Sequence, residues 1–219
     1  MGLLQQCLIA IVLHNYRSWL VGDYAMALRG RSESDRNSGH WWYKEFAPDE
    51  RAQIEEAYKP LGSGTAEALV LSDSPFQLSA LIGHLKKEEL REFGYKLTER
   101  ADSLIRDDAP ILDLHFYWHQ RGNFFYRWRE LDSLALREAV ESYERQIELA
   151  PKAVKAFDLD DLGAIPAHAG YRQLRIIEEK RGNLASARAL CVQAKSQGWS
   201  DDWDKHIARI DKKISKQSK

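Results

Sequence analysis

Two histidines, His115 and His119, have the spacing that comes closest to a metal site in this sequence. Because they are four residues apart, both imidazoles would lie on one face of a helix, where zinc could bind them. Zinc would need a third and a fourth ligand, and Asp113 is the only nearby carboxylate. Phe116 stands where a His-Glu-x-x-His metalloprotease has its glutamate. We therefore expect no metal ion, and we interpret both residues as surface or groove histidines.

Nucleophilic and phosphate-binding motifs are missing from the sequence as well. The two cysteines, Cys7 and Cys191, are far apart and stand in no recognisable motif, and Cys191 occupies a helix position that we expect to be buried and inert. The glycines at 62 and 64 lack the lysine and the preceding strand of a phosphate loop. We therefore expect a protein without catalysis and without a cofactor.

Two aromatic segments suggest alternative functions in which the protein binds a ligand. Trp41, Trp42 and Tyr43 could line a pocket for a small molecule or a substrate, although we favour a wedge that closes one end of a helical stack. Residues 116–129 interleave aromatic side chains with arginines, a pattern that can bind single-stranded nucleic acid. On a helix those aromatics point around most of the circumference, so we expect most to be core and the arginines to pair with acids.

Composition limits the class of protein. Hydrophobic residues make up 44% of the 219 residues and charged residues 30%, which is typical of neither a disordered nor a membrane protein. The apolar run at 8–13 is far shorter than the roughly 20 residues of a spanning helix. The net charge of −1 creates no field that favours nucleic acid. We expect a cytoplasmic protein that has reduced thiols and no membrane or nucleic-acid partner.

Helical periodicity organises the second half of the chain. Apolar residues recur at helical spacing on both sides of Gly182-Asn183 within 168–199. The glycine suits a left-handed helix end and the asparagine can cap the next helix. Residues 111–128 and 134–149 form an earlier predicted pair, followed by Pro151 and an extended connection. A polar-outside helix over 201–214 would then cover the end of the stack.

This half of the chain, roughly 111–214, resembles the tetratricopeptide repeat, a helix–turn–helix unit of about 34 residues, and it looks like uncharacterised bacterial proteins of that type. The resemblance implies that the first helix of each pair faces a concave groove that takes a peptide or a partner helix. The groove positions that this implies are His119, Asn123, Tyr126, Arg127, Arg172, Ile176 and Glu179. Arg127 and Arg172 would favour an acidic ligand, because guanidinium groups pair bidentately with carboxylates.

The sequence thus predicts an all-α protein of antiparallel helix pairs. We expect a tetratricopeptide-like, right-handed superhelical stack in residues 109–219, packed on an N-terminal helical bundle in residues 1–108. The bundle would begin with a buried helix over residues 3–20. The expected function is that of a non-catalytic scaffold or adaptor for a protein or peptide partner. A small-molecule binder or enzyme using Trp41, Trp42 and Tyr43 is one alternative, and single-stranded nucleic-acid binding by 116–129 is another.

Overall fold

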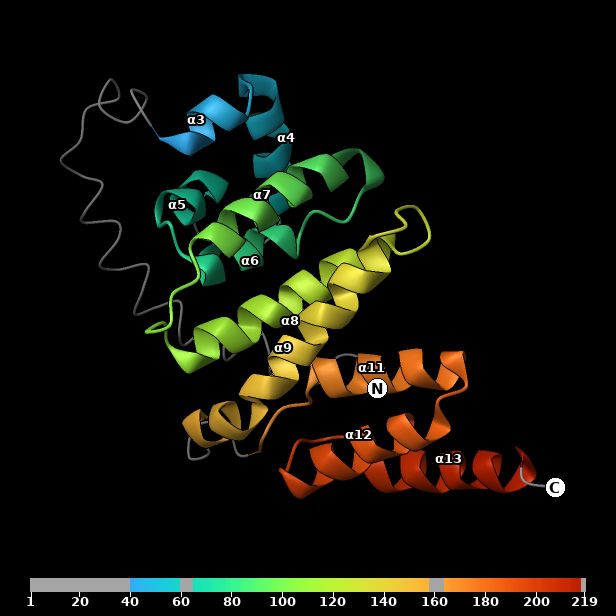
Figure 1. Ribbon diagram of the computed structural model, residues 1–219. Coiled ribbons are helices and arrows are strands. Elements are labelled where there is room, and N and C mark those ends of the chain that lie inside the picture. Colours follow the sequence, from blue (N-terminus) through green and yellow to red (C-terminus); the bar gives the residue numbers. More distant parts are fainter. Residues whose placement is uncertain (1–39, 60–64, 158–163, 218–219) are drawn as a thin grey trace. The chain divides into compact units, whose positions relative to one another are not determined.

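The computed structural model describes residues 40–59, 65–157 and 164–217 (Figure 1). Every regular element in these ranges is helical, which confirms the all-α prediction for this part of the chain. The predicted N-terminal helix over residues 3–20 lies outside the described residues. The elements are α3 (Trp41–Glu45), α4 (Pro48–Tyr58), α5 (Ala66–Leu71), α6 (Pro75–Ile82), the 3-10 helix η2 (Glu88–Leu90), α7 (Arg91–Ser103), α8 (Ile111–Trp128), α9 (Ala135–Ala156), α11 (Ala169–Arg181), α12 (Leu184–Ser196) and α13 (Trp203–Gln217).

The described chain divides into two compact units between Ala109 and Pro110. The predicted domains, 1–108 and 109–219, stay a prediction as independent folding units. Within the described ranges, none of the helices combines the length with the apolar character that crossing a membrane requires.

The unit that ends at Ala109 is built around the aromatic and aliphatic side chains of its short helices. Thr65 and Ser74 cap α5 and α6 through their side-chain oxygens, as expected for these residue types. Helix α6 packs on α7. The backbone forms the 3-10 turn η2 directly before α7, and α7 ends at Ser103.

The unit that begins at Pro110 opens with two long helices, α8 and α9, which run side by side (Figure 1). Tyr143 of α9 is fully buried at their junction. A Cβ atom added to Gly122 of α8 would lie 2.5 Å from the Tyr143 ring, and one added to Gly170 of α11 would lie 2.8 Å from the Tyr143 carbonyl oxygen. Both glycines therefore allow a neighbouring helix to approach α9 closely.

Helix α9 is longer than the sequence suggests. We expected it to end near Leu149, before Pro151, with an extended connection from Lys152; instead the helix continues through Pro151 to Ala156. A proline lacks one hydrogen-bond donor, but the helix continues where tertiary contacts hold the next turn. Here Ala153 and Phe157 are buried in the core shared with α11, α12 and α13.

Helices α11 and α12 form the second pair, joined by a tight turn. Gly182 has the left-handed φ of 82°, as expected, and the backbone N–H of Asn183 donates to the backbone carbonyl oxygen of Glu178 at 2.9 Å. Asn183 is the N-cap residue of α12, as predicted, but its side chain makes no capping hydrogen bond and donates to the Glu178 carboxylate instead. Helix α13 then packs on α12, with Trp203 and Ile210 in the shared core. The right-handed superhelical stack itself stays a prediction.

Candidate functional site

A groove between α11 and α13 concentrates basic side chains around a single carboxylate. It encloses about 270 Å³, and we call it the α11–α13 groove. Its lining residues are Arg175, Ile176, Glu179, Lys180, Arg209 and Lys213. Four basic residues and one acid leave three formal positive charges. The groove therefore has the electrostatic character of an anion-binding surface with one aliphatic side chain in it.

Local sequence explains why these residues share one face of each helix. The His168 side chain caps the start of α11 by accepting from the Tyr171 amide, and Gly182 ends the helix in the left-handed region. Arg175 and Glu179 are four residues apart, so they lie on one face of α11. Arg209 and Lys213 have the same spacing on α13, and Trp203 anchors that helix by donating from its indole to the Trp199 carbonyl oxygen at 2.6 Å.

The Glu179 carboxylate is the electrostatic centre of the groove. It accepts hydrogen bonds from Arg175 Nη1 at 2.7 Å and from Lys213 Nζ at 2.9 Å. Both terminal nitrogens of Arg209 also donate to it, and so they tie α13 to α11. These hydrogen bonds, the Arg209 pair foremost, lower the pKa of the Glu179 carboxyl to about 2 although its side chain is only 8% exposed. Glu179 is therefore ionised at neutral pH.

Arg175 lies at the floor of the groove. Its side chain is 8% exposed, and its Nε atom is a buried donor that has no acceptor in the described part of the chain. A buried donor without a partner is costly, and such groups often mark a place where water or a ligand binds. Cys191 is fully buried, and burial raises the pKa of its thiol to about 11, which supports the prediction that it is inert.

The predicted groove positions do not form one continuous surface. The structure brings Ile176 and Glu179 together in the α11–α13 groove. Arg172, also on α11, instead pairs through its Nε atom with Asp201 Oδ2 at 3.1 Å. The four cations of the groove were not predicted, although the four-residue spacing of two of them on one face of α13 was a usable signal; they are Arg175, Lys180, Arg209 and Lys213.

The predicted positions on α8 have other contacts. The Asn123 side-chain oxygen accepts a hydrogen bond from the Tyr143 hydroxyl at 3.0 Å. The Arg129 guanidinium lies over the Tyr126 ring, 4.2 Å from its centroid. Arg127 is partly buried, and burial lowers the pKa of its guanidinium. None of these side chains, nor His119, lines the α11–α13 groove.

The arginine-rich helix α8 directs its most buried arginine into the core. The Arg121 guanidinium donates to Ser142 Oγ at 2.7 Å and to Glu138 Oε2 at 3.0 Å, and it packs over the Phe125 ring. The arginine thus pairs with an acid, as expected. It stabilises the α8–α9 junction and is not positioned to stack on nucleic-acid bases.

His115 is not the surface or groove histidine that we expected. It is 3% exposed, and its ring is stacked on the Trp199 ring at a centroid distance of 5.4 Å and lies 5.0 Å from the His168 ring. Burial lowers the pKa of His115 to about 3 and that of His119 to about 4. The sequence interpretation failed because α9, α11 and the Trp199 segment together cover this face of α8. In the described residues, no group of three or more candidate ligands could hold a metal ion.

The aromatic segment at 41–43 is used mainly for packing. Trp42 is 1% exposed and belongs to the core. The Trp41 indole donates to Asp73 Oδ1 at 3.2 Å, and the Tyr43 hydroxyl donates to Glu67. Asp73 also accepts from Arg100 at 2.8 Å, so it links Trp41 to α7. These contacts favour a wedge over a ligand pocket.

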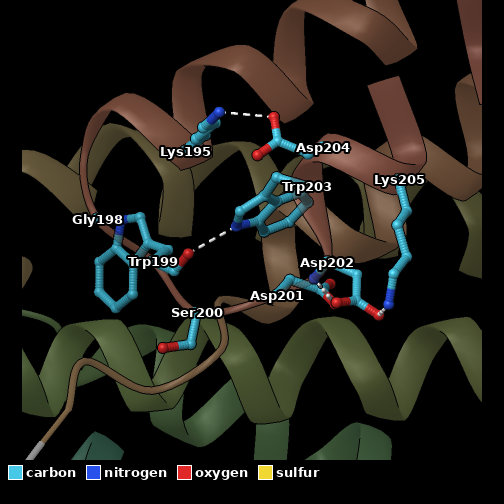
Figure 2. A pocket seen from close by; sticks show the side chains of 9 residues that line it. All are labelled: Lys195, Gly198, Trp199, Ser200, Asp201, Asp202, Trp203, Asp204 and Lys205. Carbon is cyan, nitrogen blue, oxygen red and sulfur yellow. Dashed lines mark hydrogen bonds and ion pairs between the residues drawn. The ribbon is translucent and has the colours of Figure 1, made fainter. Parts of the chain in front are cut away.

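A second hollow, of about 370 Å³, lies where α12 leads into α13 (Figure 2). Its charges are largely compensated: Lys195 pairs with Asp204 at 2.6 Å and Lys205 with Asp202 at 2.9 Å. Figure 2 shows both pairs beside the Trp203 indole. Although this hollow is larger, the α11–α13 groove is the stronger candidate because its charge is unbalanced and its floor holds a donor without an acceptor.

Comparison of the chain with protein-family models, with curated proteins and with solved structures finds no match.

Proposed function

We propose that this protein is a non-catalytic, cytoplasmic interaction scaffold of the tetratricopeptide type, which binds a peptide or a helix of a partner protein. The single observation that carries the proposal is the α11–α13 groove, which holds Ile176 and Glu179, two of the predicted contact positions. An aliphatic side chain between unbalanced charges suits a polypeptide ligand, because such a ligand offers apolar and polar groups at short intervals.

The two alternative functions have less support. An enzyme or small-molecule site at residues 41–43 would need accessible aromatic faces, whereas Trp42 is core and its neighbours donate to acids. Single-stranded nucleic-acid binding by residues 116–129 would need arginines that project together, whereas Arg121 is buried against Glu138. The α11–α13 groove, by contrast, can bind a ligand without exposing core aromatic rings or freeing a paired arginine.

Site-specific photo-crosslinking tests the proposal. A photoreactive amino acid is placed at Ile176, and the protein is irradiated in lysate of its native host. The matched control carries the same residue at Val192 of α12, which is 43% exposed and lies outside the groove. We expect a protein adduct at Ile176 that is absent at Val192. Equal adducts at both positions, or none at either, would contradict the scaffold function.

A further inference from the structure

We propose that the α11–α13 groove selects an acidic segment of its partner, and that α13 supplies two of the four cations of the binding site. This inference rests on the proposed function and names the partner's chemistry. The sequence suggested an acidic ligand held by Arg127 and Arg172, with α13 serving only as a solvating cap. The structure assigns recognition to a different set of cations, whose accessible members are Arg209 and Lys213 of α13 and Lys180 of α11.

The first argument is hydrogen-bonding capacity. A carboxylate offers about four lone-pair positions. Those of Glu179 are filled by one bond from Arg175, one from Lys213 and two from Arg209. The surrounding cations keep unused donors, because an ammonium has three N–H groups and a guanidinium has five. Glu179 therefore holds the cations in position without exhausting what they can donate.

The second argument is accessibility. The Arg209 side chain is 42% exposed and that of Lys213 is 48% exposed, although both contact Glu179. Lys180 is exposed at the rim, and the structure gives it no ion pair among the described residues. A carboxylate arriving from solvent can therefore reach donors on both helices without displacing Glu179.

The third argument is complementarity. Three uncompensated positive charges attract an anion, and the unpaired Arg175 Nε atom marks a donor that lacks an acceptor. Ile176 adds an aliphatic surface among the cations. An acidic segment that carries an aliphatic side chain next to its carboxylates matches both features. A bare polyanion would match only the charge.

The probe is a fluorescein-labelled peptide of glutamates with one central leucine, and binding is followed by fluorescence anisotropy. The test compares Lys213→Glu, which changes the groove, with Lys212→Glu, which makes the same charge change at an exposed neighbour that does not line the groove. Lys180→Glu is a second groove variant that leaves the contacts of Glu179 intact. Circular dichroism of each variant establishes that it is folded.

We expect both groove variants to bind the probe about tenfold more weakly than wild type, and Lys212→Glu to change binding by less than about twofold. Wild-type binding should also weaken as salt rises from about 50 to about 300 mM. Equal losses in all three variants would overturn the inference, because they would show attraction by net charge alone. Absence of wild-type binding to the probe would overturn it too.

Control ligands separate the acidic peptide from other anions. Probes that contain lysine in place of glutamate, single-stranded oligonucleotides and phosphatidylserine vesicles should bind weakly and without a difference between the Lys213 and Lys212 variants. If an oligonucleotide or a vesicle reproduces that difference as strongly as the peptide, the partner class is wrong. A specific adduct at Ile176 together with no acidic preference would leave the scaffold function standing and remove only this inference.

Discussion

The two helix junctions around α11 are stabilised by different forces. At the α8–α9–α11 junction, the buried Tyr143 packs against two glycines on neighbouring helices, and aromatic rings surround neutral histidines. At the α11–α13 junction, Tyr171 and Trp203 belong to a shared apolar core, while the Glu179 carboxylate and three cations hold the edge together. Close packing stabilises the first junction, and ion pairs stabilise the edge of the second.

This difference indicates where binding is possible. Close packing around Tyr143 leaves no room, since even one methyl group at Gly122 would meet the ring. A charged edge keeps accessible donors, because one carboxylate cannot satisfy all the N–H groups around it. The two junctions should therefore respond differently to acid, to loss of an ion pair and to added volume.

Acid should give the largest difference in stability between the two junctions, because it destabilises the α8–α9–α11 junction. Burial first, and the charge of His119 second, lower the pKa of His115 to about 3, and burial also lowers that of His168. In the unfolded chain both histidines bind a proton near the ordinary histidine pKa of about 6.5. The stability that the neutral histidines contribute is therefore fully present above that pH and is lost as pH falls from 6.5 toward 3. His115 alone should cost about 2 kcal/mol between about pH 7 and about pH 5, as measured by urea unfolding.

Two variants test whether this loss of stability in acid comes from the α8–α9–α11 junction. His115→Gln should reduce the pH dependence by about one proton. Glu179→Gln should keep the wild-type slope between about pH 7 and about pH 5, because Glu179 has a pKa of about 2 and its stabilisation is lost only below the ordinary value near 4.5. A wild-type slope in His115→Gln would show that other groups cause the acid sensitivity.

Removal of one cation from each junction should give unequal losses. Arg121→Met removes the donor to the Ser142 hydroxyl and leaves the Glu138 carboxylate with only the exposed Arg137, in a site where the Arg121 side chain is 10% exposed, and should cost about 3 kcal/mol. Arg209→Met should cost less than about 1 kcal/mol, since Arg209 is 42% exposed and Glu179 keeps other cations. Denaturant unfolding of both variants measures the two losses, and equal values would contradict the comparison.

Added volume should give the smallest difference between two compared variants. Gly122→Ala places a Cβ atom 2.5 Å from the buried Tyr143 ring, and overpacking of this kind costs about 2 kcal/mol. Gly182→Ala meets no atom within 4 Å and strains only a backbone with φ of 82°, so it should cost about 1 kcal/mol. Thermal unfolding compares the two variants.

The steric cause can be tested separately. Tyr143→Leu removes part of the ring that the new methyl group would meet, so Gly122→Ala should be less harmful in that background. The same second change should leave the effect of Gly182→Ala unchanged. If the background makes no difference to Gly122→Ala, the cost has another origin.

Much of the local structure could be predicted because it depends on nearest neighbours. Residues 111–128 form a helix with the predicted bounds, and Gly182 ends α11 in the left-handed region as its type suggests. The end of α9 could not be predicted, because the turn beyond Pro151 is held by tertiary burial of Ala153 and Phe157. The low helix propensity of proline favours a helix end at Pro151, but tertiary packing overrides this preference.

Sequence reasoning found only two of the six residues that line the candidate site. Ile176 and Glu179 were predicted as contact residues because they recur on one face of a first helix. Arg209 and Lys213 were assigned to a cap, since periodicity shows that a face is polar but does not show which helix it meets. The surface position expected for His115 was wrong for the same reason, because its neighbours come from distant segments.

By itself, the sequence determined the helical class, the bounds of α8 and the Gly182 turn, because periodicity and backbone preference act within a few residues. Only the tertiary structure decided that Glu179 is buried among three cations, that Arg172 is paired with Asp201 and that His115 is neutral in the core. Charge pairing and desolvation depend on which segments meet in space, and one-dimensional spacing does not contain that information.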